Sequence, residues 1–134
     1  MIWTTCLAAL FAVLLRNAFA SRVGRYPWLL AALGVGLNLL VVVANGGFMP
    51  QSADARAAAR GGSVAVTAQS SEPRLRNIVP MNDQTQLSLL GDVIAEPSWL
   101  PNSNVVSIGD LLLGSGLAWW AFVITTSTAR RVVR

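Results

Sequence analysis

The sequence predicts an all-α integral membrane protein, with three transmembrane helices and a long, partly irregular extracytoplasmic segment between the second and third helices. Two observations predict this class. Hydrophobic residues make up 54% of the 134 residues and charged residues only 12%, whereas a soluble domain carries about twice that share of charged residues. The apolar residues are also gathered into three blocks, rather than spread at the period of a surface helix or strand, and such blocks are typical of membrane proteins.

The first predicted transmembrane helix covers residues 1–20. Its uninterrupted apolar part ends before Arg16 and is only about 21 Å long at the helical rise. It crosses a core of about 30 Å only if Arg16 reaches the interface and the following residues complete the last turn. A cleaved signal peptide is the alternative, because A-F-A precedes Ser21. The arginines follow the apolar run instead of preceding it, and this charge order favours a true transmembrane helix.

The second helix is predicted over residues 27–45 and the third over residues 110–128. Short arginine-rich segments stay in the cytoplasm, and these are the loop at residues 21–26 and the tail at residues 129–134. All six acidic residues lie within or directly after the remaining segment, residues 46–109. We therefore expect a multi-pass protein of the bacterial cytoplasmic (inner) membrane, with the N-terminus outside and the C-terminus in the cytoplasm.

The extracytoplasmic segment contains several local signals. Ser52 and Gly61 are suited to begin and end a short helix, and a low-complexity run follows that we interpret as a spacer. The apolar residues near 83–91 are too few to cross a membrane, so they predict a short helix lying in the outer interface. Ser107-x-x-Asp110 has the form of a capping box for the third helix.

Three short motifs are expected to meet at the outer ends of the helices. N-G-G-F-M-P ends the second helix, with Asn45 or Gly46 in the left-handed conformation and Pro50 preventing the helix from resuming. Phe48 and Met49 are then free to lie in the membrane interface. L-G-D-V-I and S-I-G-D follow on the same side. We expect these motifs to pair and to form an outer-surface docking motif of Asn45, Gly46, Gly47, Met49, Pro50, Gly91, Asp92, Ser107, Gly109 and Asp110.

Three side chains inside the predicted helices are candidates for contact with a partner, a lipid or a pigment. Asn38 is expected to form an interhelical hydrogen bond beside small residues, and by helical rise Gly116 lies at a similar depth. Trp119 and Trp120 fall at the centre of the third helix, where an indole N–H needs a partner. Adjacent helical residues differ by about 100° in direction. At least one indole should therefore point away from the three-helix core.

The sequence offers little for catalysis or ligation. It has no histidine and no lysine, so the commonest metal ligand and Schiff-base chemistry are excluded, and we expect no cofactor or metal ligated by side chains. Asp92 and Asp110 leave two alternatives open: the paired carboxylates of an intramembrane aspartyl protease, or a cation site completed by Asn45. The isoelectric point of about 11.1 comes from arginines beside the helices, which fits a lipid bilayer and no nucleic acid.

The three motifs together resemble an uncharacterised family of small bacterial multi-pass membrane proteins, a domain of unknown function. This family has N-G-G-x-M-P at the end of a helix, an L-G-D-x-I segment, and V-S-I-G-D at the start of its last helix. The corresponding stretches here lie within residues 33–50 and 87–116. The resemblance implies membership of a family but no known mechanism.

Two functional hypotheses follow. The first is a non-catalytic accessory or stabilising subunit of a larger bacterial membrane complex, with a photosynthetic or respiratory assembly as the leading candidate. Such a subunit would pack against other integral membrane subunits and against bound lipid, quinone, carotenoid or chlorophyll-type pigment. The second is a small membrane enzyme or transporter with an outer-face site at Asn45, Asp92 and Asp110.

Overall fold

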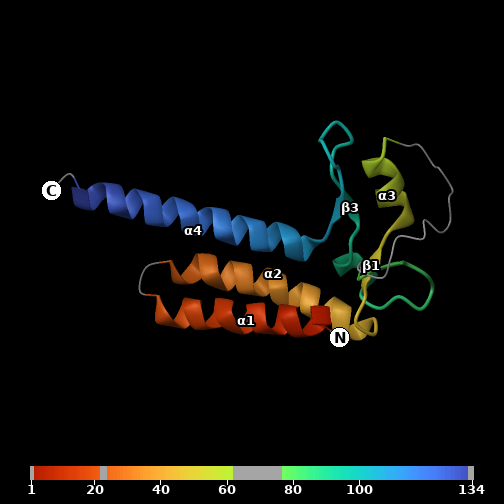
Figure 1. Ribbon diagram of the computed structural model, residues 1–134, viewed down its shortest axis with the longest axis horizontal. Coiled ribbons are helices and arrows are strands. Elements are labelled where there is room, and N and C mark those ends of the chain that lie inside the picture. Colours follow the sequence, from red (N-terminus) through yellow and green to blue (C-terminus); the bar gives the residue numbers. More distant parts are fainter. Residues whose placement is uncertain (1, 22–23, 62–76, 133–134) are drawn as a thin grey trace.

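The computed structural model describes residues 2–21, 24–61 and 77–132. Within them, the chain is mainly helical, and three helices are long and apolar enough to cross a membrane: α1 (Ile2–Ala20), α2 (Arg25–Ala44) and α4 (Ile108–Val132). They run side by side, and the other elements gather at one end of them (Figure 1). The predicted number of long apolar helices is therefore confirmed. Their bounds differ from the expected ones mainly in α4, which is longer at both ends.

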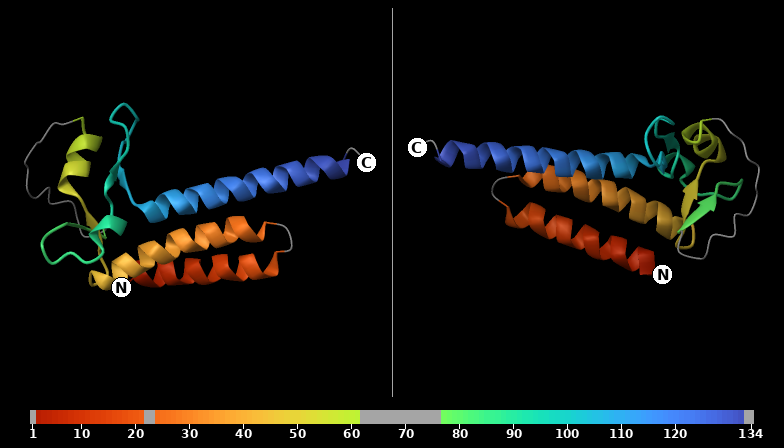
Figure 2. Two further views of the ribbon diagram at one scale, coloured as in Figure 1. Left: turned by 180° about the vertical axis from the view of Figure 1, so that it is seen from behind. Right: turned by 45° about the horizontal axis from the view of Figure 1, so that its top comes forward.

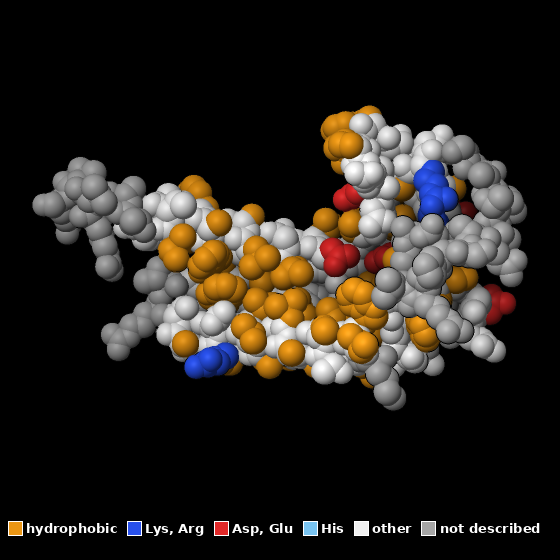
Figure 3. All heavy atoms as spheres, viewed as in Figure 1, with side chains coloured by type: hydrophobic (Ala, Val, Ile, Leu, Met, Phe, Trp, Pro, Cys, Tyr) orange, Lys and Arg blue, Asp and Glu red, His pale blue; other side chains and the backbone are white. Residues whose placement is uncertain are grey.

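The three long helices form a single layer with α2 in the middle (Figures 1 and 2). In α2, 44% of the apolar stretch is buried within the molecule. In α1 and in α4, only 11% of the corresponding stretch is buried. The outer helices are thus held by one neighbour each, and both broad faces of the layer are open. Figure 3 shows hydrophobic side chains along one of these faces.

Small residues of α2 allow α1 to approach closely. Leu14 of α1 is buried against Ala32 and Val35 of α2. Gly36 faces Phe11, whose ring would lie 3.0 Å from a Cβ at position 36. Ala32 and Gly36 therefore form a face of α2 that contacts α1.

Glycines also form the contact between α2 and α4. A Cβ at Gly34 would lie 2.6 Å from the backbone nitrogen of Leu113, and a Cβ at Gly116 would lie 2.6 Å from that of Ala31. Because Gly116 faces Ala31, the expectation that it lies level with Asn38 was wrong. Asn38 instead contacts Gly109. The first turn of α4 therefore lies about 9 Å short of the C-terminal end of α2, since Asn38 precedes Ala44 by six residues.

The same offset appears at the other end of the layer. Trp120 packs on Trp28, and its indole lies 3.4 Å from the Cβ position of Gly24, just before α2 begins. The sequence predicts Trp120 at the centre of the membrane-spanning helices. In the structure it is instead level with the first turn of α2. Beyond it, α4 continues to Val132, about 18 Å further at the helical rise, and it extends past α1 and α2 (Figure 1).

The segment between α2 and α4 contains short strands, so the all-α prediction was incomplete. β1 (Met49–Gln51) pairs in parallel with β2 (Ile78–Pro80), and β3 (Ile94–Ala95) pairs antiparallel with β4 (Val105–Val106). Strands of two or three residues are too short to show an alternating pattern in a sequence. They form here because distant segments are brought together at the end of α2.

The short helix predicted after Ser52 is confirmed as α3 (Ala53–Ala59). The Ser52 hydroxyl accepts a hydrogen bond of 3.3 Å from the backbone N–H of Ala55. Gly61 has a positive φ of 75° directly after the helix, which an L-residue rarely adopts. Ala55 and Ala59 are buried against Val105 of β4, so α3 is fixed to the β3–β4 pair.

The interfacial helix expected near residues 83–91 is reduced to one 3-10 turn, η1 (Ser88–Leu90). Leu87 has a φ of 54°, and this left-handed residue prevents a regular helix from extending through the segment. The predicted spacer at residues 62–73 lies outside the described residues.

Candidate functional site

The C-terminal end of α2 is closed by its own backbone. Gly46 and Gly47 have φ values of 68° and 96°, and the N–H of Gly47 donates to the carbonyl of Val42 at 2.8 Å. Asn45 has a φ of −108°, so of the two expected candidates Gly46 adopts the left-handed conformation. The Asn45 side chain instead exchanges two hydrogen bonds of 2.9 and 3.0 Å with the backbone of Gln86. Asn45 thus anchors the loop before η1.

The N-G-G-F-M-P and L-G-D motifs pair directly. The N–H of Asp92 donates to the carbonyl of Pro50, and the N–H of Ser52 donates to the carbonyl of Asp92, both at 2.9 Å. A Cβ at Gly91 would lie 2.6 Å from the Pro50 carbonyl oxygen, so this approach requires glycine. Met49 belongs to β1 and is half-buried. The expectation that it lies free in the interface was therefore wrong, although Phe48 is 47% exposed.

The S-I-G-D motif forms the expected capping box and also binds α2. The N–H of Ser107 donates to Asp110 Oδ2 at 2.9 Å, and the N–H of Asp110 donates to Ser107 Oγ at 3.0 Å. Asn38 Nδ2 donates to Asp110 Oδ1 at 2.7 Å, and Ser107 Oγ donates to Asn38 Oδ1 at 2.9 Å. The interhelical hydrogen bond predicted for Asn38 is therefore confirmed. It joins the cap of α4 to the middle helix.

Asp92 is a buried acid next to this cap. Its side chain is 6% exposed, and Gln51 Nε2 donates to Asp92 Oδ2 at 3.5 Å. The pKa of Asp92 is raised from 3.8 to about 6, mainly by burial and also by the negative charge of Asp110, while the hydrogen bond from Gln51 lowers it. Gln51 was not predicted as part of a site. Its only signal in the sequence is its position directly after the N-G-G-F-M-P motif.

We call the region where the three motifs meet the junction. It contains the ten residues of the expected docking motif, together with Asn38 and Gln51. Of the ten, the buried ones are Pro50, Gly91, Asp92, Ser107 and Gly109, and the exposed one is Gly46. The structure therefore places the motif mostly inside the molecule, where it holds α2, β1 and α4 together.

The two adjacent tryptophans of α4 have different surroundings. The Trp120 ring lies 5.0 Å from the Trp28 ring, centroid to centroid, at an interplanar angle of 48°. Trp119 is 46% exposed. The prediction that at least one indole points away from the helices is thus met by Trp119, which can contact lipid, pigment or another chain.

A model described as a family of unknown function (DUF5317) matches residues 1–122. The chain belongs to this family. The expected membership of a family of unknown function is therefore confirmed. No curated protein and no solved structure matches the chain. The matched residues include the whole junction and both tryptophans.

Within the junction of this DUF5317 protein, one group of side chains brings together two carboxyls, two amides and a hydroxyl: Asp92, Asp110, Asn38, Gln51 and Ser107. Asp92 and Asp110 influence each other electrostatically, but Asn45 bonds to Gln86 and is not part of this group. Among residues 2–21, 24–61 and 77–132, no three His, Cys, Asp or Glu side chains are grouped so that they could hold a metal ion. The arrangement can bind and release a proton at Asp92, since its pKa of about 6 lies near neutral pH.

Proposed function

We propose that the chain is a non-catalytic accessory subunit of a larger bacterial membrane complex and packs against other integral membrane subunits. The supporting observation is the single layer of helices, in which α1 and α4 each bury only 11% of their apolar stretch. Three helices arranged in this way bury only a small core, formed by Leu14, Ala31, Ala32 and Val35. A neighbouring protein that covers one face would supply the packing that the layer lacks.

The far side of α4 is the face best suited to such a neighbour. Gly116 faces α2, and Gly114 and Ala118 each lie two residues from it, about 200° around the helix. Both are exposed, as are Ala121 and Thr125 further along the same side, and a Cβ at Gly114 would have no neighbour within 4 Å. Small side chains repeated in this way allow a transmembrane helix of another subunit to approach closely.

We further propose the membrane orientation and the type of assembly. The end of α1, the start of α2 and the end of α4 lie at the same end of the layer (Figure 1), and the arginine-rich segments are at or beside these ends in the sequence. This arrangement supports an inner-membrane protein with the N-terminus outside and the C-terminus in the cytoplasm. By analogy with other small hydrophobic subunits, a photosynthetic or respiratory assembly is the leading candidate, with Trp119 in contact with lipid or pigment.

Purification from the native membrane in a mild detergent tests this proposal. We expect a stoichiometric complex with integral membrane partners, identified by native gel electrophoresis and mass spectrometry. Ala118→Leu should reduce the recovered partner, because it fills the small-residue side of α4. Ala9→Leu is the matched control, since Ala9 is exposed on α1. Recovery of the chain alone, under conditions that preserve known complexes of the same membrane, would refute the subunit role.

A second candidate function is a proton-linked transporter or small enzyme. The specific observation is the pKa of Asp92, raised to about 6 by burial and by the charge of Asp110. Asn45 is no longer included, because its side chain is bound to Gln86. Asp92→Asn and Asp110→Asn distinguish the two functions. If these variants lose proton flux in proteoliposomes while the complex stays intact, the result favours transport. If the wild type forms an intact complex but shows no proton flux, transport is excluded.

A further inference from the structure

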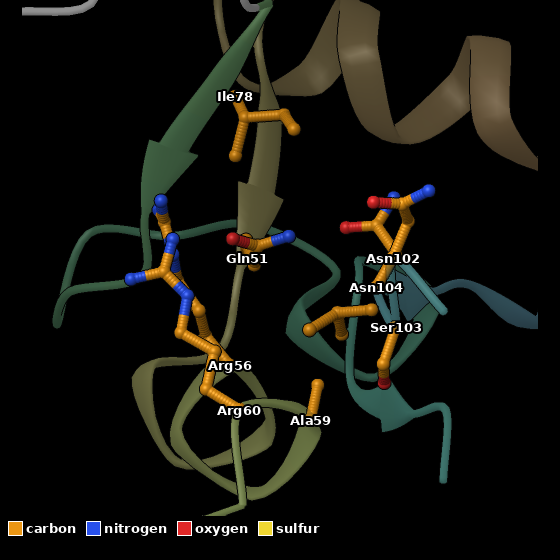
Figure 4. A pocket seen from close by; sticks show the side chains of 9 residues that line it. Gln51, Arg56, Ala59, Arg60, Ile78, Asn102, Ser103 and Asn104 are labelled. Carbon is orange, nitrogen blue, oxygen red and sulfur yellow. The ribbon is translucent and has the colours of Figure 1, made fainter. Parts of the chain in front are cut away.

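A polar pocket lies in the segment between α2 and α4. It shares Gln51 with the junction, and none of its lining residues belongs to a long helix. It has a volume of about 350 Å³, and its polar lining comes from Gln51, Arg56, Arg60, Asn102, Ser103 and Asn104. Figure 4 shows the two arginine side chains on one side of the pocket and the two asparagine side chains on the other, with Gln51 between them. Its volume is within the roughly 300–1,000 Å³ of small-molecule sites.

The packing of α3 directs both arginines to this pocket. Arg56 and Arg60 are four residues apart, so they lie on one side of the helix. Ala55 and Ala59, the residues just before them, are buried against Val105, and this contact fixes the rotation of α3. Two like charges at this spacing destabilise an isolated helix. A bound anion would remove that repulsion.

The opposite wall is held in place by its own hydrogen bonds. Ser103 Oγ donates to the carbonyl of Glu96 at 2.9 Å, and the N–H of Asn104 donates to Glu96 Oε2 at 2.9 Å. Asn102 has a positive φ of 62°. These contacts place two amide side chains opposite the guanidinium groups. The wall can therefore offer further donors and acceptors without rearrangement.

The chemistry of the lining indicates the class of ligand. Planar guanidinium groups bind phosphate and carboxylate oxygens through pairs of parallel N–H donors. Arg56 and Arg60 also have partners within the chain, and each guanidinium carries five N–H donors, so a ligand would share the guanidinium groups with those partners. Amides on the other wall suit hydroxyl groups. Figure 3 shows a small group of basic side-chain atoms near α3, apart from the hydrophobic surface of the long helices.

We infer that this pocket binds a phosphate group that carries a small hydroxylated moiety. Arg56 and Arg60 hold the phosphate oxygens, while Asn102 and Asn104 bond the hydroxyl groups. Either a soluble phosphate ester or the headgroup of a glycerol phospholipid presents this chemistry. The site is independent of the proposed subunit role, because it lies in the outer segment and not on the exposed side of α4.

The full-length chain in detergent micelles provides the soluble arm of the test. Isothermal titration calorimetry with glycerol 3-phosphate is compared with glycerol and with sodium chloride at equal ionic strength. We expect saturable binding of the phosphate ester, weakened about tenfold or more in Arg56→Gln and in Arg60→Gln. Arg16→Gln is the matched control, since it removes the same charge from an exposed position on α1. Asn102→Gly keeps the positive φ and should weaken binding severalfold.

The lipid arm uses nanodiscs that contain phosphatidylglycerol and phosphatidylcholine. Native mass spectrometry then counts the phosphatidylglycerol retained by the wild type and by each variant. Retention that is lost in Arg56→Gln and Arg60→Gln, but not in Arg16→Gln, would identify a headgroup as the ligand. Binding in the soluble arm alone would identify a soluble ester. Absence of binding in both arms, or equal losses in all three arginine variants with unchanged circular dichroism, would overturn the inference.

Discussion

Gly34 lies in a close contact of α2 with the backbone of α4, and Gly34→Ala is expected to force these helices apart. A Cβ at this position would overlap the carbonyl oxygen of Gly109 and would lie 2.6 Å from the backbone nitrogen of Leu113. Both atoms belong to the backbone of α4. They cannot rotate away as a side chain can, so the whole helix has to move.

The size of the effect follows from this geometry. Ordinary van der Waals contact begins at 3.4 Å. This is 0.8 Å more than the 2.6 Å that would separate a Cβ at position 34 from the backbone nitrogen of Leu113. A similar shift one turn away would lengthen the 2.7 Å bond between Asn38 and Asp110 beyond the useful range for a hydrogen bond. Overpacking costs roughly 1–3 kcal/mol, and a hydrogen bond between membrane helices contributes roughly 1 kcal/mol. We expect a loss of about 2–4 kcal/mol in the free energy of unfolding.

Gly114→Ala is the matched control, because a Cβ at position 114 has no neighbour within 4 Å. Both variants are unfolded reversibly with sodium dodecyl sulfate in mixed micelles, and helicity is followed by far-UV circular dichroism. Asn38→Ala should cost less in the Gly34→Ala background than alone, since the bond would already be weakened. If the two glycine variants agree within about 0.5 kcal/mol, the close contact of α2 and α4 is not the source of stability that we infer.

Three further predictions concern residues of the junction and of α4. Asp92→Asn should flatten the pH dependence of stability. Because the folded pKa of about 6 lies above the ordinary 3.8, the free energy of unfolding of the wild type should fall by roughly 1–3 kcal/mol as the pH rises from 4 to 7. If chemical unfolding shows the same dependence on pH in the variant, this reasoning is wrong. Ser107→Ala should lower the free energy of unfolding by roughly 1–2 kcal/mol through loss of the cap, whereas Ser115→Ala, at an exposed position, should not. Trp120→Ala should cost roughly 1 kcal/mol through loss of an aromatic pair, and an equal cost in Trp119→Ala would show that the pair adds nothing.

Local features of the structure could be predicted well because their causes are local. The long helices follow from apolar blocks of sufficient length. The ends of α3 follow from Ser52 and Gly61, and the start of α4 follows from Ser107 and Asp110. In each case the residues that determine the element are neighbours in the sequence, so a short pattern contains the necessary information.

The features that were missed depend on how distant segments approach each other. The offset of α4 along α2 is determined by the close contact of Gly34 with Gly109, and nothing in either helix alone indicates that this pair meets. Gln51 reaches Asp92 only because β1 lies beside the L-G-D segment. The polar pocket combines Arg56 with Asn102 from another part of the chain. Such combinations require the fold.

The offset between α2 and α4 has a consequence for the surrounding lipid. Gly116 is near the middle of the apolar stretch of α4, yet it faces Ala31, which lies toward the start of α2. The centres of the two stretches are therefore displaced by about five residues, or roughly 8 Å. In a membrane, the lipids beside α1 and the lipids beside α4 would surround apolar stretches centred at different depths. The bilayer would have to bend around the protein to match both. A neighbouring helix with the same displacement would relieve this mismatch, and its absence would favour tilting of the whole layer.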